Sequence, residues 1–579
     1  MKDKTQSPWK RPLSGKRKRY AWLVLFVVAV LLIFGIALIT DNGKSSKAEL
    51  ILASLVIGGV IALVVYALVR FVSWICCWRN FRRFAFGVAC FMTLIALAYF
   101  VENMRGRSAW LKHKAEWEGK GEKFFIADLA PRPVPDEQNF ALTPLLKPAM
   151  DYAHNPTGLT WLDTNGLARL DRFRADTQPG RDTDYKLVTG HLDKGTFADL
   201  AAWQSFYRSN TNYPQPTRAG SPAEDVLFAL GKFDAEFKEL HEALRTRPLV
   251  RFPIEYEYEP PWAILLPHLA RVRGITMVTH VRATALLEAG RSAEALEDLK
   301  LGLRLSEAIS DEPLLIDHLV RIATLGINLQ TVREGLVRHA WTDAQLTEME
   351  KQLARVDLLA EYKLAQRGER ALSATGLEWL RRQGFRASTF NYLSSDEGAG
   401  AWETVSMLFP GGWLHQNMLS ISQMHQEFTL AAADEKTRRV FPDVCDRLDS
   451  IVEKMRIRPY TMFAKLLMPA LSKAVRRSAR MQTSVDAARV AGALERHRLA
   501  TGALPESLEV LTPRYLERIP TDLFDGKPLR YRRQADGAYL IYSIGWNQAD
   551  DGGVLAWKGN KEKSVDLENG DWAWEMPAK

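Results

Sequence analysis

Four side chains that could ligate a metal ion through oxygen lie close together in the stretch from residue 543 to residue 551 of this 579-residue chain. They are Ser543, Asn547, Asp550 and Asp551. Together with backbone carbonyls before Gly552-Gly553, they offer the hard oxygen ligands that Ca²⁺ prefers in proteins, so they form a candidate calcium site. Asn and Asp are also common in turns, where they bond to their own backbone. Both interpretations are open.

The spacing of the reactive residues does not match the motifs of known metal sites or catalytic nucleophiles. No His-Glu-x-x-His or Glu-x-x-His is present, so the sequence encodes neither a zinc-protease helix nor a carboxylate di-iron bundle. We therefore interpret His268, His280 and His318 as partly buried polar residues of helix packing. Gly-x-Ser-x-Gly is absent, and Cys445 has no sequence context that would activate its thiol. No catalytic residue is assigned, and calcium is the one cofactor considered.

The elements that must position the candidate calcium ligands are a short helix and a hairpin. Gly502 and Pro505 end a long helix, and a short second helix is expected at 506–511. Two β-like runs follow, Leu529 to Arg533 and Ala538 to Ile544, joined through a turn in which Gly537 supplies the positive φ. We expect a small α+β domain at residues 484–579.

This C-terminal segment carries a recognisable pattern. Its parts are Ala493 to Arg498, Gly502-x-x-Pro505-x-Ser507-Leu508, Pro520-x-Asp522-x-Phe524-x-Gly526-x-Pro528-Leu529-x-Tyr531, and Tyr542-Ser543-x-Gly545-x-Asn547. The pattern resembles the globular part of the major pseudopilin of type II secretion. The resemblance implies a pseudopilin-like fold and a calcium site in the matching loop. The prepilin leader and apolar helix of that family do not directly precede the segment, so assembly into a pilus is not implied.

A second resemblance covers residues 102–146. Its motifs are Arg105-Gly106-Arg107, Trp110, Lys120-Gly121-Glu122, Pro133-Val134-Pro135-Asp136, Gln138-Asn139-Phe140 and Pro144-Leu145-Leu146. They resemble an uncharacterised family of bacterial membrane-anchored proteins. This resemblance implies a location and no chemistry.

Residues 136–483 are expected to form a mostly helical domain, although the sequence leaves the fold of 136–220 unassigned. Ser221 and Thr342 are typical N-caps, the second opening one helix from 342 to 370. Helices at 271–287 and 292–308 flank a turn that resembles a tetratricopeptide hairpin. No second copy follows at the expected period, so the pattern predicts an irregular array of helix pairs. Glu255 to Glu259, alternating Glu and Tyr, is predicted to be an edge strand.

Three apolar runs in the first hundred or so residues predict three membrane-spanning helices. They are Ala21 to Thr40, Leu50 to Val69 and Phe84 to Val101. They make residues 21–101 a membrane anchor, preceded by a basic tail at 1–20 and followed by a stalk and Pro-rich linker at 102–135. The tail and the 78–83 turn are rich in Lys and Arg, which places the N-terminus in the cytoplasm and the large C-terminal region outside.

The charge distribution excludes nucleic acid as a partner. The formal net charge is +9, but the tail and anchor carry the whole basic excess and leave the rest of the chain close to neutral. Only Cys445 lies beyond the apolar segments, so no disulfide can form within that region.

The sequence therefore predicts a mainly α, multi-pass protein of the cytoplasmic (inner) membrane. Its expected role is extracytoplasmic protein interaction or scaffolding, associated with secretion or the cell envelope, with the lipid bilayer and another protein as partners. The alternative is a membrane-bound hydrolase whose site is assembled from distant residues. A deep pocket uniting His, Asp and Glu side chains from different helices would favour the hydrolase, and a shallow groove with aromatic lining would favour binding.

Overall fold

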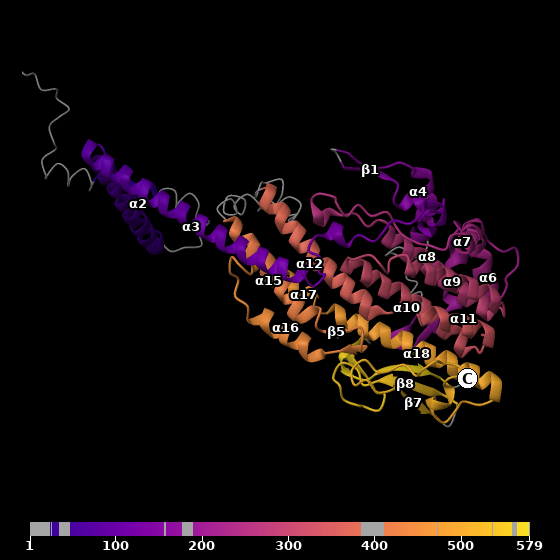
Figure 1. Ribbon diagram of the computed structural model, residues 1–579. Coiled ribbons are helices and arrows are strands. Elements are labelled where there is room, and N and C mark those ends of the chain that lie inside the picture. The colour runs from indigo at the N-terminus through magenta and orange to yellow at the C-terminus, as the bar shows by residue number, and fades with distance from the viewer. Residues whose placement is uncertain are drawn as a thin grey trace, which may run out of the picture. The chain divides into compact units, whose positions relative to one another are not determined.

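The computed structural model describes residues 24, 26–33, 47–155, 158–175, 189–383, 410–471, 473–534, 537–558 and 564–577. The chain divides into two compact units, Met1–Val101 and Glu102–Lys579. Helices account for most of the regular structure in both (Figure 1). The prediction of a mainly α protein is therefore confirmed.

The first unit contains helices that are long and apolar enough to cross a membrane. Within the described residues there are two such helices, α2 (Lys47–Ile75) and α3 (Trp78–Glu118), which contain the second and third predicted spans. Their apolar side chains are largely exposed, as lipid-facing side chains would be. The first predicted span, Ala21 to Thr40, lies mostly outside the described residues. Helix α3 also continues to Glu118, so the first part of the predicted stalk is helical.

The second unit is built mainly from helices. They are α4 (Thr164–Ala175), α5 (Leu200–Ser209), α6 (Pro222–Leu230), α7 (Asp234–Thr246), α8 (His268–Glu288), α9 (Ser292–Glu307), α10 (Leu315–Val337), α11 (Asp343–Leu353), α12 (Leu358–Gln383), α15 (Gly411–Met424), α16 (Pro442–Lys454), α17 (Met462–Leu471) and α18 (Ala474–Thr501). Consecutive helices α8, α9 and α10 pack against one another, and α10 also packs against α18. Close packing is visible where α9 meets α10, since a Cβ on Gly302 would lie 2.1 Å from the Asn328 side-chain oxygen.

Local capping signals set several helix boundaries. Ser221 forms a capping box with Glu224 at the start of α6, and Thr342 forms one with Gln345 at the start of α11. The single helix predicted from 342 to 370 is wrong, because the chain turns after Leu353 and starts α12 anew. The predicted edge strand at 255–259 is also wrong, since this stretch forms turns that bury Tyr256.

The C-terminal part adds a small antiparallel sheet. Strands β7 (Arg530–Arg533) and β8 (Tyr539–Ser543) form the predicted hairpin, with Tyr531 opposite Ile541, and β11 (Trp572–Met576) pairs with the other edge of β8. The hairpin of β9 (Leu555–Lys558) and β10 (Ser564–Gly570) forms a separate sheet. The expected short second helix is a 3₁₀ turn at Leu508–Leu511.

Helix α18 joins this sheet to the helical layer. It contacts α10 and α12 as well as β8 and β11 (Figure 1). Val485 and Leu494 of α18, Leu329 of α10, and Ile541 and Trp574 of the sheet belong to one hydrophobic core. The domain boundary expected between residues 483 and 484 therefore falls inside a helix that is shared by both layers.

Three short hairpins account for the remaining described strands. They are β1 (Tyr152–Asn155) with β2 (Gly158–Trp161), β3 (Thr189–His191) with β4 (Thr196–Ala198), and β5 (Ala433–Asp434) with β6 (Arg439–Val440). The β3–β4 hairpin matters most for the site below. Gln330 of α10 donates to the Thr196 carbonyl at 3.0 Å, and His280 of α8 bonds to the Thr189 carbonyl at 2.8 Å.

Candidate binding site

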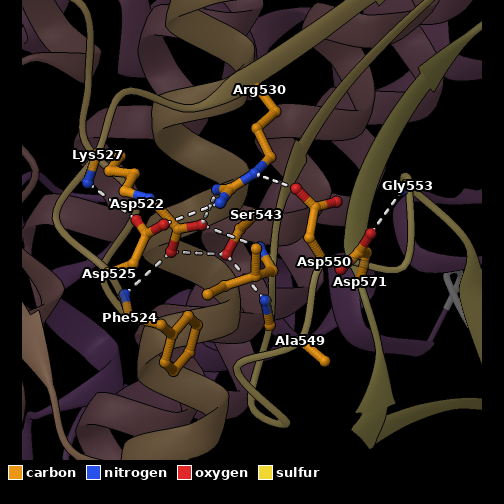
Figure 2. Close-up of polar contacts among 12 residues, drawn as sticks. Asp522, Phe524, Asp525, Lys527, Arg530, Ser543, Ala549, Asp550, Gly553 and Asp571 are labelled. Atoms are coloured by element: carbon orange, nitrogen blue, oxygen red, sulfur yellow. Dashed lines mark hydrogen bonds and ion pairs between the residues drawn. The ribbon is translucent and has the colours of Figure 1, made fainter.

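The candidate calcium loop lies beside an arginine that holds three carboxylates. Arg530 begins β7 and donates to Asp522 at 3.1 Å, to Asp525 at 2.8 Å and to Asp550 at 2.8 Å. Figure 2 shows the guanidinium between these three side chains. Asp522 and Asp525 lie in a tight turn in which Gly526 has a φ of 76°, a conformation that glycine adopts without a Cβ penalty.

The structure places the four predicted ligands in two different settings. Ser543 is buried at the end of β8 and donates to Asp522 at 3.0 Å, while Asp550 is exposed and pairs with Arg530. Asn547 donates to Asp551 at 2.9 Å, and both are exposed. Asn547 and Asp551 are thus brought together, and Ser543 and Asp550 join the Arg530 network instead.

The protonation of this network follows from burial and from Arg530. Burial raises the pKa of Asp522 above its ordinary value, despite hydrogen bonds from the Phe524 and Ile544 backbone. Burial also acts on Asp525, but the Arg530 guanidinium outweighs it and holds the pKa of that carboxyl below its usual range. Among the described residues, no group of three or more His, Cys, Asp or Glu side chains is arranged to hold a metal ion. Arg530 supplies positive charge at the point where the carboxylates converge.

A cavity of about 830 Å³ lies between the helical layer and the C-terminal sheet. Its wall comes from the β3–β4 hairpin, α10, α18 and the strands β7, β8, β9 and β11. The charged side chains in this wall are Lys194, Arg333, Arg480, Arg532, Asp193 and Glu575. Basic groups outnumber acidic ones, and Phe197, Trp557 and Trp574 add aromatic surface. We call this space the arginine cavity.

Arg333 of α10 is the most buried cation of the arginine cavity, with 3% of its surface exposed. Its Nη2 donates to the carbonyl of Gly195 at 3.3 Å and to that of Glu575 at 3.1 Å, and its guanidinium lies 4.4 Å from the centre of the Phe197 ring. Burial lowers the pKa of Arg333, but an arginine stays charged at physiological pH.

Two buried donors in this wall have no acceptor among the described residues. They are Nη1 of Arg333 and the indole Nε1 of Trp574. A buried donor without a partner costs about 1–3 kcal/mol, and more when it is charged. The arginine cavity therefore favours a ligand or water that brings an acceptor oxygen, and a carboxylate would also compensate the charge of Arg333.

A second group of interest is buried among helices. His268 of α8 bonds to Glu312 at 3.0 Å, and Asp317 of α10 is coupled electrostatically to both groups. Burial lowers the pKa of His268 to about 4 and raises the pKa values of Glu312 and Asp317 well above their ordinary range. No more than 5% of any of the three residues is exposed, so a substrate in solution has no direct access to them.

The three histidines singled out from the sequence lie among packed helices, and they are almost fully buried rather than partly buried as predicted. His268 bonds to Glu312, His280 bonds to Thr331 at 2.7 Å, and His318 bonds to Ser478 at 2.7 Å. Cys445 is also buried, and burial raises the pKa of its thiol to about 12, which keeps it protonated and unreactive.

Comparison with known proteins gives no relative from which a function could be carried over. No family model, no curated protein and no solved structure matches the chain. The resemblances to the pseudopilin globular domain and to the membrane-anchored family remain predictions.

The residues of the arginine cavity could not be identified from the sequence, because they come from remote parts of the chain. Asp193 belongs to the β3–β4 hairpin, whose fold was unassigned, and it pairs with Arg480 of α18 at 2.9 Å. Arg333 falls in the last two turns of α10, a helix that is buried over most of its surface, and nothing near it in the sequence marks its side chain as part of a cavity wall. The pairing of Arg480 with Asp193 could not be read from spacing.

Proposed function

We propose that this chain is a membrane-anchored binding protein whose second unit takes up an acidic segment of a partner protein in the arginine cavity. The observation that carries the proposal is the pair of buried donors, Arg333 Nη1 and Trp574 Nε1, which have no acceptor among the described residues. A Glu or Asp side chain, or a C-terminal carboxylate, brings acceptor oxygens for such donors and would compensate the buried charge of Arg333.

The composition of the cavity wall supports an acidic peptide as the ligand. Lys194 and Arg532 are exposed, and neither forms an ion pair within the described part of the chain. Trp557, 45% exposed, offers apolar surface beside them. A volume of about 830 Å³ is within the usual range of ligand sites and fits a few residues of an extended chain. Arginine and aromatic side chains are enriched in protein interfaces.

Location is part of the same proposal. Helices α2 and α3 would hold the chain in the cytoplasmic membrane, with the basic tail at residues 1–20 on the cytoplasmic side and the second unit outside. Support comes from the Lys and Arg content of the tail and of the 78–83 turn. A scaffolding role in the cell envelope or in secretion follows from this location and from the pseudopilin-like pattern of residues 484–579.

Calcium stays a separate proposal for the loop at 547–551. Asn547 and Asp551 are exposed and adjacent, so their oxygens are available to an ion without breaking the Arg530 network. The hydrolase alternative gains no support from the cluster of His268, Glu312 and Asp317, because these groups are closed to solvent.

Binding of a labelled acidic peptide tests the proposed function. The full chain in mild detergent is titrated against a fluorescein-labelled hexaglutamate peptide, with hexaglutamine as the uncharged competitor, and anisotropy is recorded. Arg532→Glu should weaken binding at least about tenfold, because it reverses a charge in the cavity wall.

Arg533→Glu is the matched control. Arg533 follows Arg532 in β7 and its side chain points to the opposite face, where it donates to the Leu504 carbonyl at 3.0 Å. The same charge change at this position should leave binding within about twofold, apart from long-range effects that salt screens. Equal losses in the two variants, or equal binding of hexaglutamine, would refute recognition in the arginine cavity.

A further inference from the structure

The stretch from Lys454 to Leu471 has an unusual composition for a surface segment. It contains the basic residues Lys454, Arg456, Arg458 and Lys465 and no acidic residue. None of the four forms an ion pair with any described residue, although Lys465 donates to the Met455 carbonyl. We call this stretch, which covers the end of α16, a loop and α17, the basic segment.

The basic segment also exposes large apolar side chains. Ile457 in the loop is 77% exposed, and Leu466 and Leu467 of α17 are 73% and 37% exposed. The opposite face of α17 is buried, with Ala464, Met468 and Leu471 in the hydrophobic core. The helix therefore presents an apolar edge that its own fold does not cover, next to unpaired cations.

The loop of the basic segment is fixed to helix α15. Asn417 of α15 donates to the Pro459 carbonyl at 2.6 Å and accepts from the Phe463 backbone at 3.1 Å. Ser420 donates to the Tyr460 carbonyl at 3.2 Å. These bonds hold the exposed side chains in a defined place.

Helix α15 is in turn fixed to the part of α3 that follows the apolar run. Asn103 accepts from the Gly412 backbone at 2.7 Å, and a Cβ on Gly106 would lie 2.2 Å from the Gly412 carbonyl oxygen, so the two backbones touch. The Arg105 guanidinium lies 5.3 Å from the centre of the Tyr460 ring. Helix α15 lies beside this part of α3, and α17 packs against α15 (Figure 1).

The α3 residues in these contacts closely follow the apolar run in the sequence. The apolar run ends at Val101, and Arg105 follows four residues later in the same helix. At 1.5 Å per residue it lies about 6 Å beyond the run, which is the depth of the lipid headgroups. Tyr460 of the basic segment contacts Arg105, so this segment touches a residue that follows the apolar run by four positions in the sequence.

We propose that the basic segment docks on the membrane surface, with Ile457, Leu466 and Leu467 among the headgroups and the four cations bound to anionic phospholipids. Basic segments with a few large apolar residues bind anionic interfaces in this way. This inference rests on the membrane anchoring in the proposed function and is independent of the arginine cavity.

Fluorescence quenching by labelled lipid tests the docking. Cys76, Cys77 and Cys90 are replaced by Ala in the full chain, the buried Cys445 is kept, and Ile457→Cys is labelled with an environment-sensitive dye. The protein is reconstituted into phosphatidylcholine vesicles with or without phosphatidylglycerol, both with a nitroxide at headgroup depth. We expect strong quenching at position 457 that increases with phosphatidylglycerol. The same label in Val510→Cys, another exposed apolar position, should show little quenching.

Charge reversal supplies the second variant. Each basic residue near an anionic surface strengthens the contact about fivefold, so Arg456→Glu with Arg458→Glu should remove the phosphatidylglycerol dependence. Unquenched label at 457 in vesicles that retain the chain after carbonate extraction would overturn the docking alone. Energy transfer between labelled copies at that position would then identify a second copy of the chain as the occupant. Release of the chain by carbonate would instead refute the anchoring.

Discussion

His318 gives the sharpest prediction about stability, because it must stay neutral in the folded chain. It lies on α10 with 3% of its surface exposed and bonds through Nε2 to Ser478 of α18 at 2.7 Å. Burial, with a smaller contribution from Arg321, lowers its pKa to about 3. Glu361 lies 3.9 Å from its Nδ1, but Arg321 is closer to that carboxylate at 3.3 Å. The carboxylate is thus already paired.

The sign and size of the pH effect on stability follow from the different numbers of protons that the unfolded and folded chains bind at His318. The folded-state pKa of His318 lies below the ordinary value of 6.5, so its contribution is fully present above pH 6.5 and is lost as the pH falls toward 3. Between pH 6 and pH 4.5 the unfolded histidine is mostly protonated and the folded one is not. At about 1.4 kcal/mol per pH unit, this interval removes about 2 kcal/mol from the free energy of unfolding.

The substitution His318→Asn isolates this contribution, since Asn can still bond to Ser478 but does not titrate. Urea unfolding of the full chain in mild detergent, followed by tryptophan fluorescence, gives the free energy of unfolding at both pH values. The variant should lose about 2 kcal/mol less than the natural chain between pH 6 and pH 4.5. His191→Asn, at an exposed position of β3, serves as the control for the loss of a histidine side chain. Equal pH dependence in His318→Asn and the natural chain would refute a neutral buried His318.

Two further predictions concern the loop and the helix packing. If Asn547 and Asp551 bind calcium, Ca²⁺ at a hundred times its dissociation constant should stabilise the full chain by about 2.7 kcal/mol and raise its melting temperature. Asp551→Asn should abolish this rise. A melting temperature of the natural chain that Ca²⁺ leaves unchanged would refute the calcium site. Gly368→Ala should lower the free energy of unfolding in urea by at least about 3 kcal/mol, because its Cβ would lie 1.4 Å from the Pro313 carbonyl oxygen. Gly492→Ala on α18 is the control, because its Cβ meets only an ordinary contact at 3.9 Å and should not lower the free energy of unfolding.

Features with a local cause could be predicted from the sequence. The caps at Ser221 and Thr342, and the glycine that ends α18 with a φ of 84° at Gly502, depend on residues within one turn of each other. The β7–β8 hairpin follows from its alternation and its turn residues in the same way. These signals do not depend on what the rest of the chain does.

The candidate site depends on contacts between remote residues, and the sequence could not supply them. Nothing near Arg333 indicates that Gly195 and Glu575 will approach it from opposite parts of the chain. The loop at 543–551 shows the same limit. Its oxygens are close in sequence, but Ser543 bonds to Asp522 and Asp550 bonds to Arg530. The positions of Asp522 and Arg530 depend on the fold of the turn before β7.

The break between α11 and α12 has a local cause in the sequence, but the apolar periodicity across it points to a single helix. Asp357 accepts from the backbone of Leu359 and Ala360 at 3.1 Å each, which is a regular N-cap for α12. Leu353 and Leu358 nevertheless both enter the core, so the apolar spacing runs on through the turn and suggests one helix. A periodic pattern reports which side chains are buried, and it does not require one continuous helix. Asp357 therefore indicates the start of a new helix more directly than the apolar period indicates a continuous one, because its side chain caps the backbone of Leu359 and Ala360.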